Sequence, residues 1–172
     1  METTSTPGET MMKAQPQKEH GWLEKLVGEW TYEGEAPAEP GKPPEKFSGT
    51  ETVRSLGGLW FVAEGRGTVP GGDGHTTIAT VGYDPQKRTY VGTWIGSMMN
   101  HLWVYERGDV DATERVLTLE AEGPSMTEEG KTARYRDVIE FRSDDERILT
   151  GNVLGNDGKW EQMMSMTYRR KR

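Results

Sequence analysis

The stretch RYRDVIEFR, residues 134–142, alternates apolar and charged side chains more cleanly than any other part of the chain. Tyr135, Ile139 and Phe141 share one parity, while the three arginines and Glu140 share the other. Successive side chains of a strand point to opposite faces, so this stretch predicts a strand with one buried and one solvated face. Asp137 has the buried parity and is therefore a candidate functional carboxylate.

The same alternation recurs in residues 29–35, 59–64, 116–121 and 160–169. In the last of these stretches Trp160 shares its parity with Met164, so both are expected to face inward. Glycine-, aspartate- and asparagine-rich turns separate the strands, and residues 156–158 (Asn-Asp-Gly) are a strong hairpin signal. About nine or ten strands at short spacing predict an all-β, lipocalin-like, antiparallel up-and-down β-barrel. A sandwich with Greek-key crossings is the alternative, because strand order cannot be read from the pattern.

One short N-terminal helix is expected over Lys18–Val27, where Trp22, Leu23 and Leu26 form a narrow apolar stripe. The 172 residues correspond to one domain. We expect a disordered lead-in over residues 1–17 and a single barrel domain over residues 18–172.

Two segments, residues 90–97 and 102–105, are apolar on both faces. Burial on both faces means that the N-terminal helix or a second copy of the chain covers one wall of the barrel. A homodimer through the wall around Ile95, Leu102 and Trp103 is the assembly that we predict.

Composition excludes several classes of function. The chain has no cysteine, which removes disulfides, thiol catalysis and cysteine-ligated metals. A net charge of −7 argues against nucleic acid as the main partner. No apolar run is long enough to span a membrane, and the polar start does not read as a secretory signal. We therefore expect a cytoplasmic protein without a membrane or nucleic-acid partner.

The two ends of the barrel region carry a recognisable pair of motifs. Gly28-Glu29-Trp30 opens the first strand, and Tyr168-Arg169-Arg170 closes the last. This pair resembles the calycin barrels, in which a basic side chain of the last strand packs over the tryptophan of the first. A guanidinium over an indole is a favourable cation–π pair. The resemblance implies that Trp30 is buried against Arg169 or Arg170.

Three interior segments make the resemblance more specific: residues 56–60 (Leu-Gly-Gly-Leu-Trp), 82–84 (Gly-Tyr-Asp) and 90–94 (Tyr-Val-Gly-Thr-Trp). Together they resemble the bacterial domain-of-unknown-function family numbered fifteen seventy-nine, over roughly residues 18–170. The resemblance implies a lipocalin-like barrel in a bacterial protein. It implies no activity and no catalytic residues.

The three histidines are the usual acid–base candidates near neutral pH. His20 and His75 are expected at the surface, whereas His101 lies near a barrel rim and is a candidate for a ligand site. Their spacing predicts no metal site. Some calycin-like barrels, the nitrobindins, bind haem through a histidine late in the chain, and no histidine follows His101. We therefore predict neither a metal nor a cofactor.

Three classes of function stay open. The leading hypothesis is a module that binds a small apolar or amphipathic ligand in or at the mouth of the barrel. The predicted ligand-binding residues combine aromatic or Met contact area with two polar groups: Trp94, Met98, His101, Trp103, Tyr135, Asp137 and Met164.

The second class is a cofactor-independent isomerase or hydrolase with Asp137 or Glu51 as general base and His101 as acid. Glu51 qualifies because it also has inward parity. The third class is a structural or interaction protein with a filled core. In that case both carboxylates would belong to an internal polar network with partners such as Arg54, Arg136, Tyr135 or Gln162.

Overall fold

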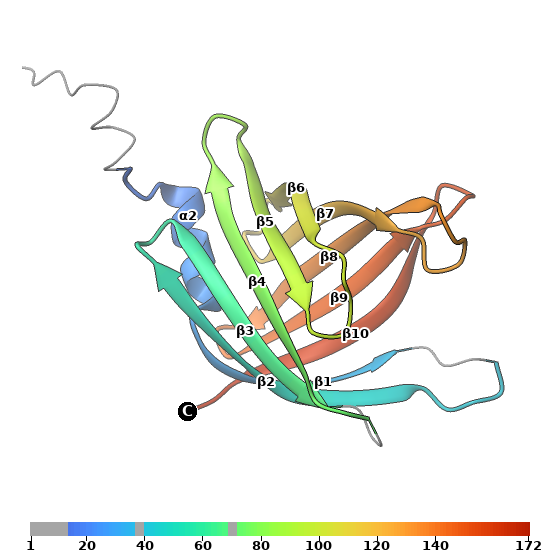
Figure 1. Ribbon diagram of the computed structural model, residues 1–172. Helices are drawn as coiled ribbons and strands as arrows, with labels where there is room; N and C mark the ends of the chain where they lie inside the picture. Colours follow the sequence, from blue (N-terminus) through green and yellow to red (C-terminus); the bar gives the residue numbers. More distant parts are fainter. Residues whose placement is uncertain (1–13, 37–39, 69–71) are drawn as a thin grey trace, which may run out of the picture.

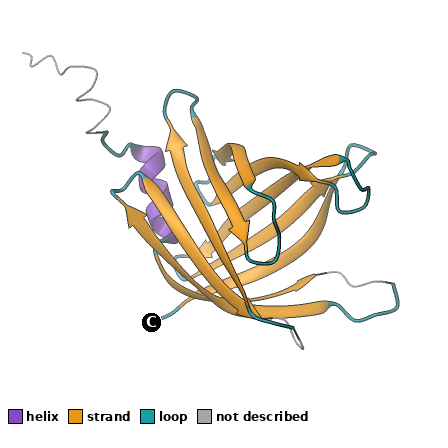
Figure 2. Ribbon diagram, in the orientation of Figure 1, coloured by secondary structure: helices purple, strands orange, loops and turns teal. Residues whose placement is uncertain are grey.

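The computed structural model describes residues 14–36, 40–68 and 72–172, which form an antiparallel β-barrel (Figure 1, Figure 2). The first element of the described ranges is a short helix, α2 (Lys18–Leu23), which continues into a 3-10 turn, η1 (Glu24–Leu26). The strands are β1 (Gly28–Ala36), β2 (Glu45–Leu56), β3 (Trp60–Thr68), β4 (His75–Asp84), β5 (Thr89–Gly96), β6 (Trp103–Val110), β7 (Val116–Pro124), β8 (Thr132–Ser143), β9 (Glu146–Leu154) and β10 (Trp160–Arg170).

Each strand pairs with the strand that follows it in the sequence, and β1 also pairs with β10. Tyr32 of β1 lies opposite Gly49 of β2 on one side and opposite Tyr168 of β10 on the other. This closure leaves no sheet edge exposed, which removes the usual site of strand-to-strand aggregation. The predicted up-and-down barrel is confirmed, and the Greek-key alternative is wrong.

The helix α2 covers one end of the barrel (Figure 1). The ring centroid of Trp22 lies 5.7 Å from that of Phe141 in β8, and its indole N–H donates to the carbonyl of Glu114 at 2.7 Å. The hydroxyl of Tyr90 in β5 donates to the carbonyl of Glu19 at 2.9 Å. The helix predicted over Lys18–Val27 is confirmed, and its apolar stripe packs into the barrel end.

The buried core gathers at this α2 end. Its fully buried large side chains are Leu23, Trp30, Phe61 and Leu117. Side chains of this size each contribute about 1.5–3 kcal/mol when they leave water. The packed end therefore contributes hydrophobic stabilisation at the point where the helix meets the strands.

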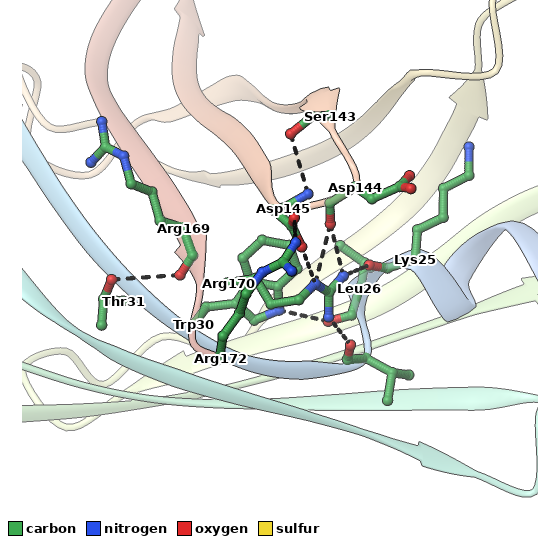
Figure 3. A network of polar contacts seen from close by, with 11 residues as sticks. Lys25, Leu26, Trp30, Thr31, Ser143, Asp144, Asp145, Arg169, Arg170 and Arg172 are labelled. Atoms are coloured by element: carbon green, nitrogen blue, oxygen red, sulfur yellow. Dashed lines mark hydrogen bonds and ion pairs between the residues drawn. The ribbon is translucent and has the colours of Figure 1, made fainter.

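The first and last strands are joined at this same end through Trp30 and Arg170 (Figure 3). Trp30 is completely buried, and the guanidinium of Arg170 lies 4.2 Å from its ring centroid. Arg169 points to the outer face and pairs with Glu33 at 2.8 Å. The expected contact between Trp30 and a terminal arginine is confirmed, with Arg170 as the partner.

His20 is buried, so the expectation of a surface position was wrong. Its side chain is 3% exposed, and its Nδ1 accepts the backbone N–H of Gln17 at 2.9 Å. Its ring meets that of Tyr83 edge-on. The reason is helical period: His20 and Leu23 are three residues apart and share the face that packs into the barrel.

The helix does not cover the outer wall of β5 and β6. Ile95, Leu102 and Val104 are 45%, 56% and 44% exposed on that wall. Of the two covers expected from the sequence, the helix is therefore wrong, and a second copy of the chain stays a prediction. Trp103, which was expected on this wall, faces the interior instead, where its ring meets that of Tyr135. The apolar stripe of the helix packs instead inside the barrel end, where Trp22 contacts the rings of Tyr90 and Phe141.

Trp160 faces outward, contrary to its parity with Met164. A β-bulge between Gln162 and Met164 shifts the register of β10 against β9. An extra residue in a strand reverses the faces beyond it, so alternation stops being a guide at that point. The ring of Trp160 consequently stacks under the guanidinium of Arg136, whose central carbon lies 4.1 Å from the ring centroid.

Most of the lead-in expected over residues 1–17 lies outside the described residues. Within the described ranges, no helix has the length and apolar character that a membrane crossing requires.

Candidate functional site

The barrel interior changes character from one end to the other. We call the half that lies away from α2, toward the loops that connect β1–β2, β3–β4, β5–β6, β7–β8 and β9–β10, the distal half. Many of its inward-facing positions carry little or no side chain: Gly49, Gly65, Gly67, Ala79, Gly96, Gly123 and Gly151. The inward-facing Phe47, Trp94, Trp103 and Met166 are only partly buried. The largest fully buried side chains, among them Trp30, Phe61 and Leu117, belong instead to the end under the helix, where Tyr83 and Ile139 are partly buried as well.

Two of these glycines set the position of the tryptophans. A Cβ at Gly123 would collide with the ring of Trp103, and a Cβ at Gly96 would collide with the ring of Trp94. Each ring thus occupies the space that a side chain of its glycine would need. The glycines let both rings lie against the barrel wall, where they line the interior.

All seven residues predicted from the sequence lie on the distal half or its rim. Trp94 and Trp103 are cross-strand partners on β5 and β6. Tyr135 and Asp137 face inward from β8, and Met164 faces inward from β10. Met98 and His101 belong to the loop between β5 and β6, at the distal end.

Three of these side chains form one aromatic contact chain. The ring of His101 lies 4.8 Å from that of Trp103, which in turn lies 4.9 Å from that of Tyr135, with both contacts edge-to-face. The hydroxyl of Tyr135 donates to the carbonyl of Pro124 at 2.6 Å, and the indole N–H of Trp103 points to the sulfur of Met99 at 3.1 Å. These anchors hold the aromatic chain at a fixed orientation.

Asp137 lies deeper in the distal half. It accepts a hydrogen bond of 2.5 Å from the hydroxyl of Tyr105 in β6. Its neighbours across the sheet are Leu119 and Gly151, and the side chain of Met164 lies over the same glycine. Burial raises the pKa of Asp137 above its ordinary value, and the hydrogen bond from Tyr105 lowers it only in part.

Glu51 is satisfied in a different way. Its carboxylate forms an ion pair with the guanidinium of Arg147, which is 3% exposed and packs against the rings of Trp30 and Tyr168, at 4.6 and 3.9 Å from their centroids. The two aromatic rings stabilise the buried guanidinium through cation–π contacts, and the carboxylate of Glu51 neutralises its charge.

The partners proposed from the sequence for the two carboxylates were wrong. Arg136 points outward and pairs with Glu120 at 2.7 Å. The actual partners, Arg147 and Tyr105, were missed. Both have inward parity in their own strands, so alternation offers a signal for them. Nothing in the sequence says which strands would bring them to Glu51 and Asp137.

The three groups suggested for general acid–base catalysis are not joined to one another. Among the described residues, no hydrogen bond links His101 to Asp137 or Glu51, and the Nε2 atom of His101 is buried without a partner. No group of three or more His, Asp or Glu side chains in the described ranges converges to hold a metal ion. The arrangement offers inward-facing aromatic side chains and one carboxylate, Asp137, that has no cationic partner among the described residues.

Two hollows lie on the other side of the barrel. One of about 580 Å³ lies between β1, β2, β3 and β10, and one of about 360 Å³ between β2, β3 and β4. His75 lines the smaller hollow and is partly buried, so its expected place at the surface holds only in part. None of the seven predicted residues lines either hollow.

Comparison with known proteins supports the fold. The family model described as "Protein of unknown function (DUF1579)" matches residues 15–170. No curated protein matches the chain. The solved structure of Rv2717c from M. tuberculosis is similar over 92% of this chain and 100% of its own, with 15% identity and a TM-score of 0.61.

Two further solved structures are also similar. A de novo designed fluorescence-activating β-barrel matches 87% of this chain and 96% of its own, with 13% identity and a TM-score of 0.48. The structure of EF1p2_mFAP2b bound to DFHBI matches 90% of this chain and 100% of its own, with 12% identity and a TM-score of 0.48.

Proposed function

This chain belongs to the DUF1579 family, and on that premise we propose that it binds a small, partly apolar ligand in the distal half of its barrel. The contact surface is aromatic and thioether: Trp94, Trp103, Tyr135 and Met164. His101 and Asp137 supply polar contacts that orient the ligand, and Met98 lies at the entrance. Ligand sites commonly combine an apolar lining with a few placed polar groups.

The observation that carries this proposal is the contrast between the two halves of the interior. The largest fully buried side chains lie at the end under α2, whereas the distal half sets partly exposed rings, Trp94 and Trp103, against inward-facing glycines. Interiors are normally packed to the density of organic crystals. Aromatic side chains that face inward and still keep exposed surface support an interior that accepts a guest.

A titration with the neutral dye Nile red, which brightens in an apolar environment, tests the proposal. We expect saturable binding that weakens about tenfold in Trp103→Ala, because a buried aromatic contact is worth more than 1.4 kcal/mol. Trp60→Ala is the matched control, because Trp60 lies over Gly82 on the outer face and is 43% exposed. Absence of saturable binding, or equal loss in both variants, would contradict a distal site and favour a structural role with a filled core.

A further inference from the structure

We propose that the ligand of the distal half carries a positively charged amine next to an aromatic or other apolar group. This inference rests on the proposed function, since it names the chemistry of the ligand at the same site. It follows from the charges that line the interior and from the side chains around Asp137.

The first step is an account of the inward-facing charges. Glu51 and Arg147 form a pair with each other, so together they add no net charge. Asp137 is different, because the described residues offer it no cation within ion-pair distance. Its one polar contact there is the neutral hydroxyl of Tyr105. A buried carboxylate without a counter-charge is costly, so a cation at this point would be strongly favoured.

The second step is that the nearby arginines are already engaged elsewhere. Arg136, the next residue in the chain, lies on the outer face, where it pairs with Glu120 and stacks on Trp160. Arg134 lies on the same outer face and also faces Glu120, at 3.6 Å. Arg147 is held by Glu51 and by two aromatic rings. The barrel wall separates the outer arginines from Asp137, so a cation that pairs with its ionised form has to come from a ligand.

The third step concerns the rest of the ligand. Trp103 and Tyr135 face the interior on the rim side of Asp137, and Met164 lies beside it. Aromatic rings attract cations and also bind apolar groups, so this lining suits an ammonium with an apolar substituent. An anionic ligand would meet the uncompensated carboxylate and be repelled.

A matched set of three probes of similar size separates these chemistries. They are 2-phenylethylamine, 2-phenylethanol and 3-phenylpropanoate, each measured at neutral pH and constant ionic strength by displacement of Nile red. We expect the amine to bind about tenfold more tightly than the alcohol, which corresponds to about 1.4 kcal/mol for one ion pair. The propanoate should bind most weakly.

Asp137→Asn keeps an oxygen that accepts the Tyr105 hydroxyl and removes only the charge. In this variant the amine should lose its advantage over the alcohol, while binding of the alcohol stays unchanged. Asp109→Asn is the control, because it makes the same change in net charge at an exposed position of β6. This control variant should keep the tenfold preference for the amine over the alcohol. That result would exclude the explanation that the amine is attracted only by the protein's net charge of −7.

A second variant keeps the test valid if Asp137→Asn does not fold, as judged by circular dichroism. Tyr105→Phe leaves the carboxylate in place without its neutral partner, and the amine preference should persist or increase. Equal binding of amine and alcohol, or failure of all three probes to displace bound Nile red, would overturn the amine inference and leave the proposed function intact. Failure of Nile red to bind would overturn both.

Discussion

The guanidinium of Arg170 covers the indole of Trp30 and at the same time holds three backbone segments. It donates to the carbonyl of Val27 at 2.6 Å, to that of Lys25 at 3.0 Å and to that of Asp144 at 3.0 Å (Figure 3). One side chain of the last strand thus joins the end of the helical segment, the start of β1 and the turn between β8 and β9.

Loss of this side chain should destabilise the whole barrel. We expect Arg170→Ala to lower the free energy of unfolding by about 2–4 kcal/mol, because four charge-assisted hydrogen bonds to three carbonyls, an ion pair with Asp145 and one cation–π contact are lost together. Equilibrium unfolding in urea measures the change. Arg169→Ala is the matched control, since Arg169 is exposed and forms only surface ion pairs, which are worth about 0–1 kcal/mol. Equal losses in the two variants would contradict the role of Arg170.

The pair of Glu51 and Arg147 offers a second test of stability. Glu51→Ala should cost about 3–5 kcal/mol, because it leaves the charge of Arg147 buried without its partner. The double variant Glu51→Leu with Arg147→Met should recover most of that loss, because it removes both charges and fills the space with apolar groups. A double variant that is less stable than Glu51→Ala would show that the charge pair itself specifies the fold.

The strands could be predicted because alternation reports local geometry. In β8 the parity is kept from Tyr135 through Ile139 to Phe141, before the register shift at the end of the strand, and their inward position was predicted correctly. In β10 the bulge before Met164 breaks that parity, so Trp160 was placed on the wrong face. Bulges depend on the pairing of two strands, and the pattern of one strand does not contain them.

The site was predictable only in part, for a related reason. Alternation identified the inward position of Asp137 and Glu51, which needs only their own strands. Their partners lie 32 and 96 residues away in the sequence, on strands whose order the pattern cannot supply. The burial of His20 could not be predicted for the same reason, because it depends on how the helix packs into the end of the barrel.

Self-association provides a prediction about the outer wall of β4, β5 and β6. Ile78 and Ile95 are cross-strand partners there, and with Val104 they expose apolar surface next to Thr80 and Thr93, with no charge among them. Two copies with a net charge of −7 repel each other over most of their surface, so an uncharged apolar wall is where a second copy can approach.

We expect a homodimer through this wall, seen by sedimentation at several protein concentrations. Ile95→Lys should shift the equilibrium to monomer by about tenfold or more, because it places a charge in an apolar contact. Thr52→Lys, an exposed outward position on β2, is the control and should leave the equilibrium unchanged. A parent protein that stays monomeric at high concentration would exclude the dimer.

The carboxyl of Asp137 should make stability depend on pH in an unusual direction. Burial raises the pKa of Asp137 in the folded state above its ordinary value of 3.8. Among the described residues, its hydrogen-bond partner is the neutral hydroxyl of Tyr105, and no cation lies within ion-pair distance. Between 3.8 and that raised pKa the folded state binds more protons than the unfolded state, so stability falls as pH rises through this window.

Asp137→Asn removes the titrating group and keeps the acceptor for Tyr105. The variant should therefore be more stable than the parent at pH 7, and the advantage should disappear below pH 3.8. Urea unfolding at a series of pH values measures both curves, with Asp109→Asn as the variant whose difference from the parent should not follow this profile. A parent that gains stability relative to Asp137→Asn as pH rises would mean that the carboxylate already has a counter-charge in the barrel, which would also remove the basis for a cationic ligand.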